Sequence, residues 1–210
     1  YTMGDLAARR KEIIRQLEAD GVMNLNKELP LPRVISRVAV VSSATAAGYG
    51  DFCNQLQQSG YDFPVELFPA IMQGDRVEQS VIAALDRIAA QAGEWDVVVI
   101  IRGGGATTDL NGFDTYMLAA NVAQFPLPVL TGIGHERDDT IIDLVAHIRL
   151  KTPTAVAAFL IERRGNELAM LKVLQDRLLQ AVQQRLQHEN QRLSLLAQRA
   201  NYVAMQQVAQ

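Results

Sequence analysis

The stretch from Trp95 to Asp109 reads WDVVVIIRGGGATTD, an apolar run that ends abruptly in an arginine and three consecutive glycines. The five β-branched residues Val97–Ile101 predict a strand that is buried on both faces, as in a parallel sheet. The three glycines allow the backbone to turn sharply and to present several N–H donors to an anion. Arg102 adds a planar guanidinium that can bind a phosphate bidentately. The glycines alone are equally typical of an ordinary flexible turn, so the rest of the chain must decide the function.

Composition limits the class of protein. With 210 residues, 49% hydrophobic and 20% charged, the chain has enough apolar material for one globular domain and an additional segment. The net charge of −3 does not indicate general binding to nucleic acid, although a local groove lined by arginines would still bind a polyanion. Cys53 is the only cysteine, which excludes a disulfide framework and favours the reducing cytoplasm. No apolar run is long enough to span a bilayer, so we expect a soluble protein.

The order of the expected elements predicts the fold class. An amphipathic helix is expected from Thr2 to Asp20, followed by a polar linker from Asn24 to Pro32. Strands that alternate with helices are then expected at Val34–Val41, Val65–Met72, Val97–Ile101 and Leu127–Ile133. This alternation predicts an α/β fold with an open, mostly parallel sheet and helices on both faces. Ligands of such sheets bind at the carboxyl ends of the strands, so the loops after the first, third and fourth strands should converge there.

Two of these loops carry acidic residues whose roles the sequence leaves open. Asp51 is expected at the start of the helix after the first strand, where a cap or a favourable interaction with the helix dipole is the simpler role.

The fourth strand is followed by the sequence GIGHERDDTIIDLVA, residues 132–146. A helix is expected from near Asp138, with its apolar face formed by Ile141, Leu144, Val145 and Ile148. Asp138 fits a cap as well as a chemical role, and Asp143 falls on the polar, solvated face. His135 lies beside a glycine directly after a buried strand, which favours chemistry.

Together these residues are suited to phosphodiester hydrolysis. Arg102 and the loop amides would stabilise charge on the phosphorane, the histidine would move protons, and the carboxylates would orient the histidine or hold a metal. No zinc-ligand spacing is present, but a loosely bound Mg²⁺ on Asp138, Asp143 and a substrate phosphate stays open. A dinucleotide-dependent enzyme is disfavoured because Thr108 occupies the position of the third glycine. A non-catalytic scaffold that carries the helices is the remaining alternative.

The last part of the chain is expected to be helical. Thr152 and Pro153 form a helix start, a capping hydroxyl followed by proline at the first helical position. Apolar residues then recur in a narrow stripe: Leu168, Leu171, Leu178, Val182, Leu186, Leu193, Leu196, Ala200 and Val203. Such a stripe predicts a coiled coil or a helical hairpin that needs a partner surface on another copy, another part of the chain or another protein. The predicted domains are residues 1–32 (helix and linker), 33–152 (α/β catalytic domain) and 153–210 (coiled-coil-like helical segment).

The run RGGGATTDL and the later run GIGHERDDTIIDLVAHIRLKTPTAVA resemble the large subunit of exodeoxyribonuclease VII. The family signature GHxxDxxxxDxxA is matched by Gly134, His135, Asp138, Asp143 and Ala146. The opening YTMGDLAARRKEII and the stretch PLPRVISRVAVVSS are similar to the family's lead-in to its catalytic domain. The glycine loop departs from the family's GRGGGSxEDL at Ile101, Ala106 and Thr108, so roles for that serine and that glutamate do not carry over.

The resemblance implies a set of site residues and an activity. The catalytic candidates are Asp51, Arg102, His135, Asp138 and Asp143, and the phosphate-binding glycines are Gly103, Gly104 and Gly105. The implied enzyme is an exonuclease that degrades single-stranded DNA from either end to oligonucleotides and nucleoside 5′-phosphates, with no strictly required cofactor and no assigned metal ligand. Its long helices would bind several copies of a small subunit. An OB-fold that grips single strands would precede Tyr1 in the whole protein.

Overall fold

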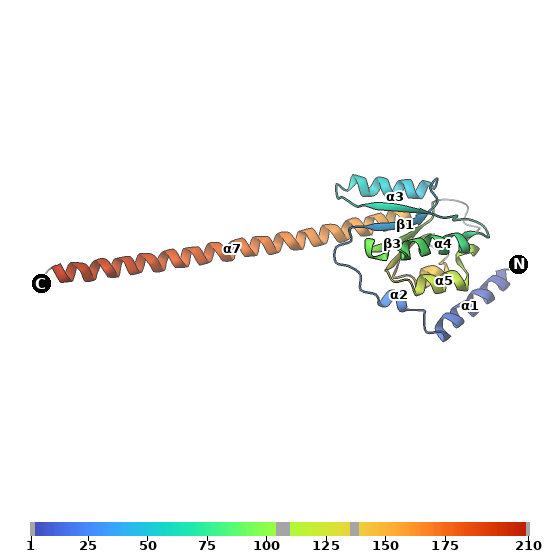
Figure 1. Cartoon of the computed structure of the whole chain (residues 1–210), viewed down its shortest axis with the longest axis horizontal. Coiled ribbons are helices and arrows are strands. Elements are labelled where there is room, and N and C mark those ends of the chain that lie inside the picture. Colours follow the sequence, from blue (N-terminus) through green and yellow to red (C-terminus); the bar gives the residue numbers. More distant parts are fainter. Residues whose placement is uncertain (1–2, 104–109, 135–138, 209–210) are drawn as a thin grey trace. The chain divides into compact units, whose positions relative to one another are not determined.

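The computed structural model describes residues 3–103, 110–134 and 139–208 of the chain (Figure 1). Contacts within the chain separate it into two units, Tyr1–Arg164 and Gly165–Gln210. Its elements, in order, are α1 (Met3–Ala19), α2 (Leu25–Glu28), β1 (Val38–Ser42), α3 (Ala47–Gln58), β2 (Val65–Pro69), α4 (Val77–Ala89), the 3₁₀ helix η1 (Ala92–Glu94), β3 (Val97–Ile101), the 3₁₀ helix η2 (Asn111–Phe113), α5 (Tyr116–Ala123), β4 (Val129–Gly132), α6 (Ile141–Val145), β5 (Ile148–Arg149) and α7 (Pro153–Val208).

The first unit is built on a sheet of five parallel strands in the order β2-β1-β3-β4-β5. The predicted α/β fold with a parallel sheet is confirmed. Strand β3 lies in the middle, and all five of its residues are fully buried, as the run of β-branched residues predicts. Because β1, β3 and β4 are neighbours and run in the same direction, their carboxyl ends lie side by side.

Helices cover both faces of the sheet, as expected. Successive residues of a strand point to opposite faces, so each strand contributes to two cores. On one face, Val98 and Ile100 of β3 pack with residues of α1, α4, α5 and α6. On the other face, Val97 and Val99 pack with Phe52 of α3 and with the first turns of α7. Figure 1 shows α3 on one side of the strands and α4 and α5 on the other.

The segment expected to be a linker, Asn24–Pro32, is instead part of the fold. It contains α2, and Asn26 within it is fully buried. The Asn26 amide donates to the carbonyls of Phe125 and Leu127 and accepts from the backbone N–H of Val129. An asparagine carries both donors and an acceptor, so it can satisfy the backbone groups that enter β4. Asn26, one of the polar residues of this segment, is therefore buried and binds the backbone of the connection between α5 and β4.

Two strand predictions are also corrected. The first strand begins at Val38 and not at Val34, because the N–H groups of Ser36 and Arg37 are bound by the Asp96 carboxylate instead of a neighbouring strand. Ile148 was expected on the apolar face of the helix after the fourth strand, but α6 ends at Val145 and Ile148 lies in β5. A strand of two residues has no periodic pattern that a sequence can reveal.

In the second unit, α7 continues without interruption to Val208, so a helical hairpin within the segment is wrong and a single coiled-coil-like helix is present. The leucines and valines of the expected stripe are 45–66% exposed where the structure describes them. Of the helices described between residues 3 and 208, none combines the length and the apolar character needed to cross a membrane.

Candidate active site at the carboxyl edge of the sheet

The first turn of α3, which follows β1, is in direct backbone contact with the loop after β3. A Cβ atom on Gly48 would lie 2.7 Å from the Cα of Gly103, and one on Gly103 would lie 2.8 Å from the backbone nitrogen of Gly48. Both positions need glycine because any side chain would meet backbone. The Cβ position of Gly103 is also 3.2 Å from the nitrogen of Ala47, so the first N–H groups of α3 lie beside the glycine loop. The expected convergence of the segments that follow β1 and β3 is confirmed.

The end of β4 and the start of α7 lie at the same edge. The backbone N–H of Arg102 donates to the carbonyl of Gly132, at 3.4 Å between N and O. A Cβ on Gly132 would lie 2.9 Å from the Thr152 carbonyl, and one on Gly48 would lie 2.9 Å from Cγ of Pro153. The Thr152 hydroxyl accepts from the N–H of Ala155, which confirms the predicted start of this helix.

Arg102 follows the last residue of β3 and is only 7% exposed. A guanidinium in such a site is weakly screened, so it acts more strongly on a nearby phosphate than an exposed arginine would. Gly103 is partly exposed beside it. Gly104 and Gly105 lie outside the described residues. The described part of the glycine loop therefore combines a buried cation, a backbone N–H and the positive end of α3.

The position of Asp51 differs from the prediction. Helix α3 begins at Ala47, after Ala46 as the N-cap, so Asp51 lies in the second turn and is exposed. Ala46, the N-cap residue, makes no side-chain hydrogen bond that would cap this helix. The small residues of the loop allow the helix to begin one turn earlier than the carboxylate suggests. Asp51 is thus neither a cap nor a first-turn charge, and a role in chemistry stays a prediction.

Asp143 also differs, because it is 4% exposed and not on a solvated face. Helix α6 begins at Ile141, close to the expected position, but its N-cap is Thr140 and not Asp138. Oδ2 of Asp143 accepts from the N–H and the hydroxyl of Thr140, at 2.9 and 2.7 Å, and the Asp143 N–H donates to the Thr140 hydroxyl. Oδ1 of Asp143 is buried and has no hydrogen-bond partner among the described residues. Buried polar atoms normally have a partner, so this oxygen can accept from a group that the described residues do not supply.

Asp114 was not singled out from the sequence, yet it belongs to this group. It lies between β3 and α5 and accepts a hydrogen bond from the N–H of Ile141, with Oδ1 2.6 Å from the nitrogen. Its Oδ2 lies 3.8 Å from Nη1 of Arg10. Burial raises the pKa of the Asp114 carboxyl, against the lowering effects of the Ile141 N–H and Arg10, and the charge of Asp143 raises it further. Its partners are distant in the sequence, so no local pattern could have revealed it.

The other expected site residues, His135 and Asp138, lie outside the described residues. Next to them, Asp139 forms an ion pair with Arg149 of β5. Across residues 3–103, 110–134 and 139–208, no three His, Cys, Asp or Glu side chains gather in a way that would hold a metal ion.

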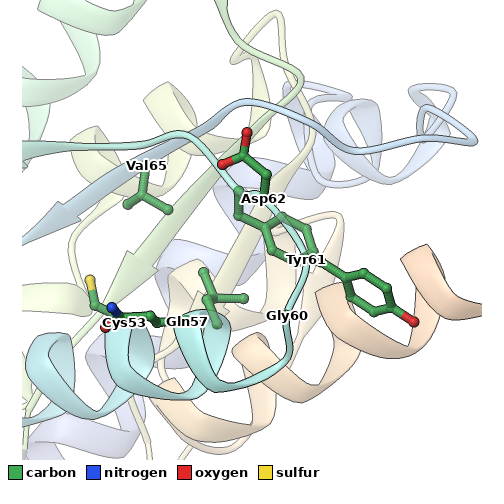
Figure 2. A pocket seen from close by; sticks show the side chains of 8 residues that line it. Cys53, Gln57, Gly60, Tyr61, Asp62 and Val65 are labelled. Atoms are coloured by element: carbon green, nitrogen blue, oxygen red, sulfur yellow. The ribbon is translucent and has the colours of Figure 1, made fainter.

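A surface pocket of about 450 Å³ lies elsewhere (Figure 2). Figure 2 shows that its lining comes from the second half of α3 and from the segment that leads into β2, including Cys53, Tyr61 and Asp62. This is the amino edge of the sheet, because α3 starts beside Gly103 and ends before β2 begins. None of the expected site residues lines it, so it is separate from the candidate active site.

The chain is similar to known proteins over most of its length. A family model described as exonuclease VII, large subunit, matches residues 22–210. The chain belongs to this family. Relatives named exodeoxyribonuclease 7 large subunit include one from Deinococcus radiodurans, 40% identical over 174 residues (80% of this chain, 42% of the relative). One from Lactobacillus helveticus is 36% identical over 192 residues (91% and 43%), and one from Nitrosomonas eutropha is 34% identical over 197 residues (94% and 44%).

The match covers every described residue of the candidate site except Arg10 of α1. The family resemblance inferred from the two motifs is therefore confirmed. The chain spans less than half the length of these relatives, so it corresponds to one part of such a large subunit.

Proposed function

We propose that this chain is the catalytic part of an exodeoxyribonuclease that hydrolyses single-stranded DNA from either end to oligonucleotides and nucleoside 5′-phosphates. The observation that carries the proposal is the meeting of the carboxyl ends of β1, β3 and β4 around Arg102, in a chain of the exonuclease VII large subunit family. Parallel α/β sheets bind their ligands at this edge. A buried arginine beside the N–H of Gly103 and the first N–H groups of α3 suits the phosphate of a nucleic-acid strand.

In the proposed reaction, the guanidinium of Arg102 and the N–H groups of the glycine loop stabilise the negative charge that grows on the phosphoryl oxygens. His135 moves protons between water, phosphate and leaving group. Asp51, Asp138 and Asp143 orient the histidine and the substrate. Oδ1 of Asp143 supports its place in this group, since it is buried, has no hydrogen-bond partner among the described residues and can accept from an incoming donor.

The proposal requires no cofactor. A loosely bound Mg²⁺ on Asp138 and Asp143 stays a prediction, and only Oδ1 of Asp143 would be open to it because Thr140 occupies Oδ2. We therefore assign no step to a metal. Cleavage is expected to persist when divalent ions are chelated, and complete loss that only Mg²⁺ restores would contradict this part of the proposal.

We also propose that several copies of a small subunit bind along α7 within residues 165–210. The relatives are named large subunits, and the exposed apolar stripe of this unit is too narrow for a globular core but suits helix-to-helix packing. In the whole protein, an OB-fold ahead of Tyr1 would supply affinity for single strands. With a single, free cysteine, the cytoplasm is the proposed location.

The proposal is tested by replacing Arg102 with Ala in the full-length protein together with its small subunit. Loss of one group that stabilises the transition state is expected to lower cleavage of single-stranded DNA at least about 100-fold. The measurement uses oligonucleotides labelled at the 5′ or the 3′ end, with double-stranded DNA as the comparison substrate. Cleavage of the single strand from both ends is expected with the unaltered protein.

The matched control is Arg37→Ala. Arg37 is an exposed arginine directly before β1, at the amino edge of the sheet. Its loss should leave cleavage nearly unchanged. Thermal unfolding of both variants shows whether Arg102→Ala still folds, and Arg102→Lys, which keeps the charge but not the bidentate geometry, serves as a milder change. Near-normal cleavage by folded Arg102→Ala would overturn the proposed role.

A further inference from the structure

The first turn of α6 is held by two carboxylates from different parts of the chain. Asp143 of α6 itself binds the N–H of Thr140. Asp114 reaches the N–H of Ile141, the first helical residue, from 27 positions earlier in the sequence. The first N–H groups of a helix have no partner within it, and negative charge there is favourable. Asp114 is therefore a cap supplied from outside the helix, with Oδ1 only 2.6 Å from the Ile141 nitrogen.

Asp114 is itself firmly placed. Phe113, directly before it, is fully buried. Thr115, directly after it, caps α5 through a hydrogen bond from the N–H of Leu118. A side chain between a buried aromatic residue and a helix cap has little freedom to move, so it can fix the position of what it binds.

The charged groups around Asp114 come from two further elements. Arg10 and Arg9 of α1 act on its carboxylate, with Arg10 Nη1 3.8 Å from Oδ2, and Asp143 of α6 acts in the opposite sense. Helix α1 is fixed to the sheet domain through buried Ile13 and Leu17. Asp114 thereby connects α1, the segment before α5 and the first turn of α6.

We propose that Asp114 is a positioning residue: through the Ile141 N–H it holds the turn of α6 that presents Asp143 at the carboxyl edge of the sheet. The inference depends on the proposed nuclease function and adds a residue that the family motif does not include. Oδ1 of Asp143 is buried without a hydrogen-bond partner among the described residues, and the direction of this carboxylate is set by the turn that carries it. A small displacement of that turn changes the geometry at the reacting phosphate without removing any group that touches it.

The test compares Asp114→Ala with Asp114→Asn in the full-length protein with its small subunit. Asparagine keeps an oxygen that accepts from the Ile141 N–H, whereas alanine does not. We expect alanine to lower kcat at least about tenfold with KM changed less than about twofold, because a misplaced group lowers rate more than binding. Asparagine should restore kcat to within about threefold of the unaltered protein, since the hydrogen bond is retained.

The matched control is Asp96→Ala, which removes another carboxylate that binds backbone N–H groups distant in the sequence, those of Ser36 and Arg37 at the amino edge of the sheet, and leaves Ile141 bound. It should reduce stability and leave kcat unchanged. Amide hydrogen exchange of Ile141 supplies a direct reading: alanine at position 114 should accelerate it at least about fivefold, and neither asparagine at position 114 nor Asp96→Ala should. Should Asp114→Ala fail to fold, Asp114→Glu, which moves the carboxylate by one methylene, is expected to lower kcat in its place.

The inference is overturned if Asp114→Ala (or Asp114→Glu in its place) cleaves at the normal rate, if Asp96→Ala lowers kcat as much, or if asparagine fails to rescue. Absence of cleavage by the unaltered complex would instead count against the proposed function. In that case the exchange rate of Ile141 still decides whether Asp114 holds the turn.

Discussion

Apolar side chains on helices are buried in the first unit of the chain and exposed in the second. In residues 1–164, leucines such as Leu17, Leu85 and Leu118 are buried against the sheet. In residues 165–210, leucines such as Leu178 and Leu186 are more than half exposed, although both groups lie on helices with a similar periodic pattern. The periodic pattern alone therefore does not decide whether a helix finds its partner within the chain.

What separates the two units is the presence of a sheet. A helix between parallel strands packs on a wide apolar face that its neighbours in the sequence supply. The stripe on α7 is narrow and has no second layer among the residues described in its unit. We therefore expect the free energy of unfolding to come mainly from the first unit. The second unit is expected to bind another helix.

The comparison is tested most strongly by the same substitution in both units. Leu118→Ala on α5 removes a fully buried side chain and is expected to cost about 2–5 kcal/mol of unfolding free energy. Leu186→Ala, where the leucine is 59% exposed, should change it by less than about 0.5 kcal/mol. Urea unfolding of both variants checks this, and equal losses would show that the two units do not differ in the way described.

A smaller effect tests how tightly the first unit is packed. Gly48→Ala places a methyl group 2.7 Å from the Cα of Gly103, so we expect a loss of about 1–3 kcal/mol and impaired cleavage. Gly50→Ala, two residues later in the same helix, meets no atom within 4 Å and should stabilise the protein by up to about 1 kcal/mol. Thermal unfolding distinguishes them, and a shift of the same sign for both would contradict the loop contact.

A pH-dependent effect follows from Asp114. Burial raises its pKa, so the carboxyl stabilises the fold fully only below its unfolded pKa of about 3.9 and loses this contribution as the pH rises through the folded value. Asparagine does not titrate. The stability of Asp114→Asn relative to the unaltered protein should therefore increase as the pH is raised from about 4 towards 7.

The matched variant in the second unit is Glu189→Gln, which breaks the exposed ion pair with Arg185. Exposed pairs of this kind contribute about 0–1 kcal/mol, so its effect should be small. Urea midpoints measured across this pH range test both variants. A stability of Asp114→Asn that falls relative to the unaltered protein as the pH rises would have the wrong sign for a raised pKa.

The smallest expected effect is that of deleting residues 165–210. All buried apolar side chains among the described residues precede Arg164, so the unfolding free energy of the first unit should change by less than about 0.5 kcal/mol. Binding of the small subunit should be lost at the same time, as measured by size-exclusion chromatography. A marked loss of stability would mean that the core extends into the second unit.

Much of the fold could be predicted because its signals are local. The run of β-branched residues predicts the buried central strand, and Thr152 with Pro153 predicts the start of α7. The linker, the start of the first strand and the short β5 could not be predicted in the same way. In each case the backbone is satisfied by a distant partner, as with Asn26 and the segment entering β4.

The residues of the candidate site also divide into those whose positions the sequence predicts and those whose surroundings it does not predict. The motifs placed Arg102 and Gly103 correctly at the end of the central strand, because a strand followed by glycines is read directly from the sequence. The surroundings of the acids were not predictable. Asp143 is buried in a capping box with Thr140, and Asp114 joins the group through its hydrogen bond with Ile141.

The sequence by itself determined the parallel α/β fold, the family, and the strand ends at which chemistry is expected. These follow from periodicity, glycine placement and motif spacing, which are properties of neighbouring residues. Only the tertiary structure decided which loops touch and which carboxylates are buried. Contacts such as Gly48 with Gly103 and Asp114 with Ile141 join residues far apart in the chain, so their energies depend on packing that no local pattern records.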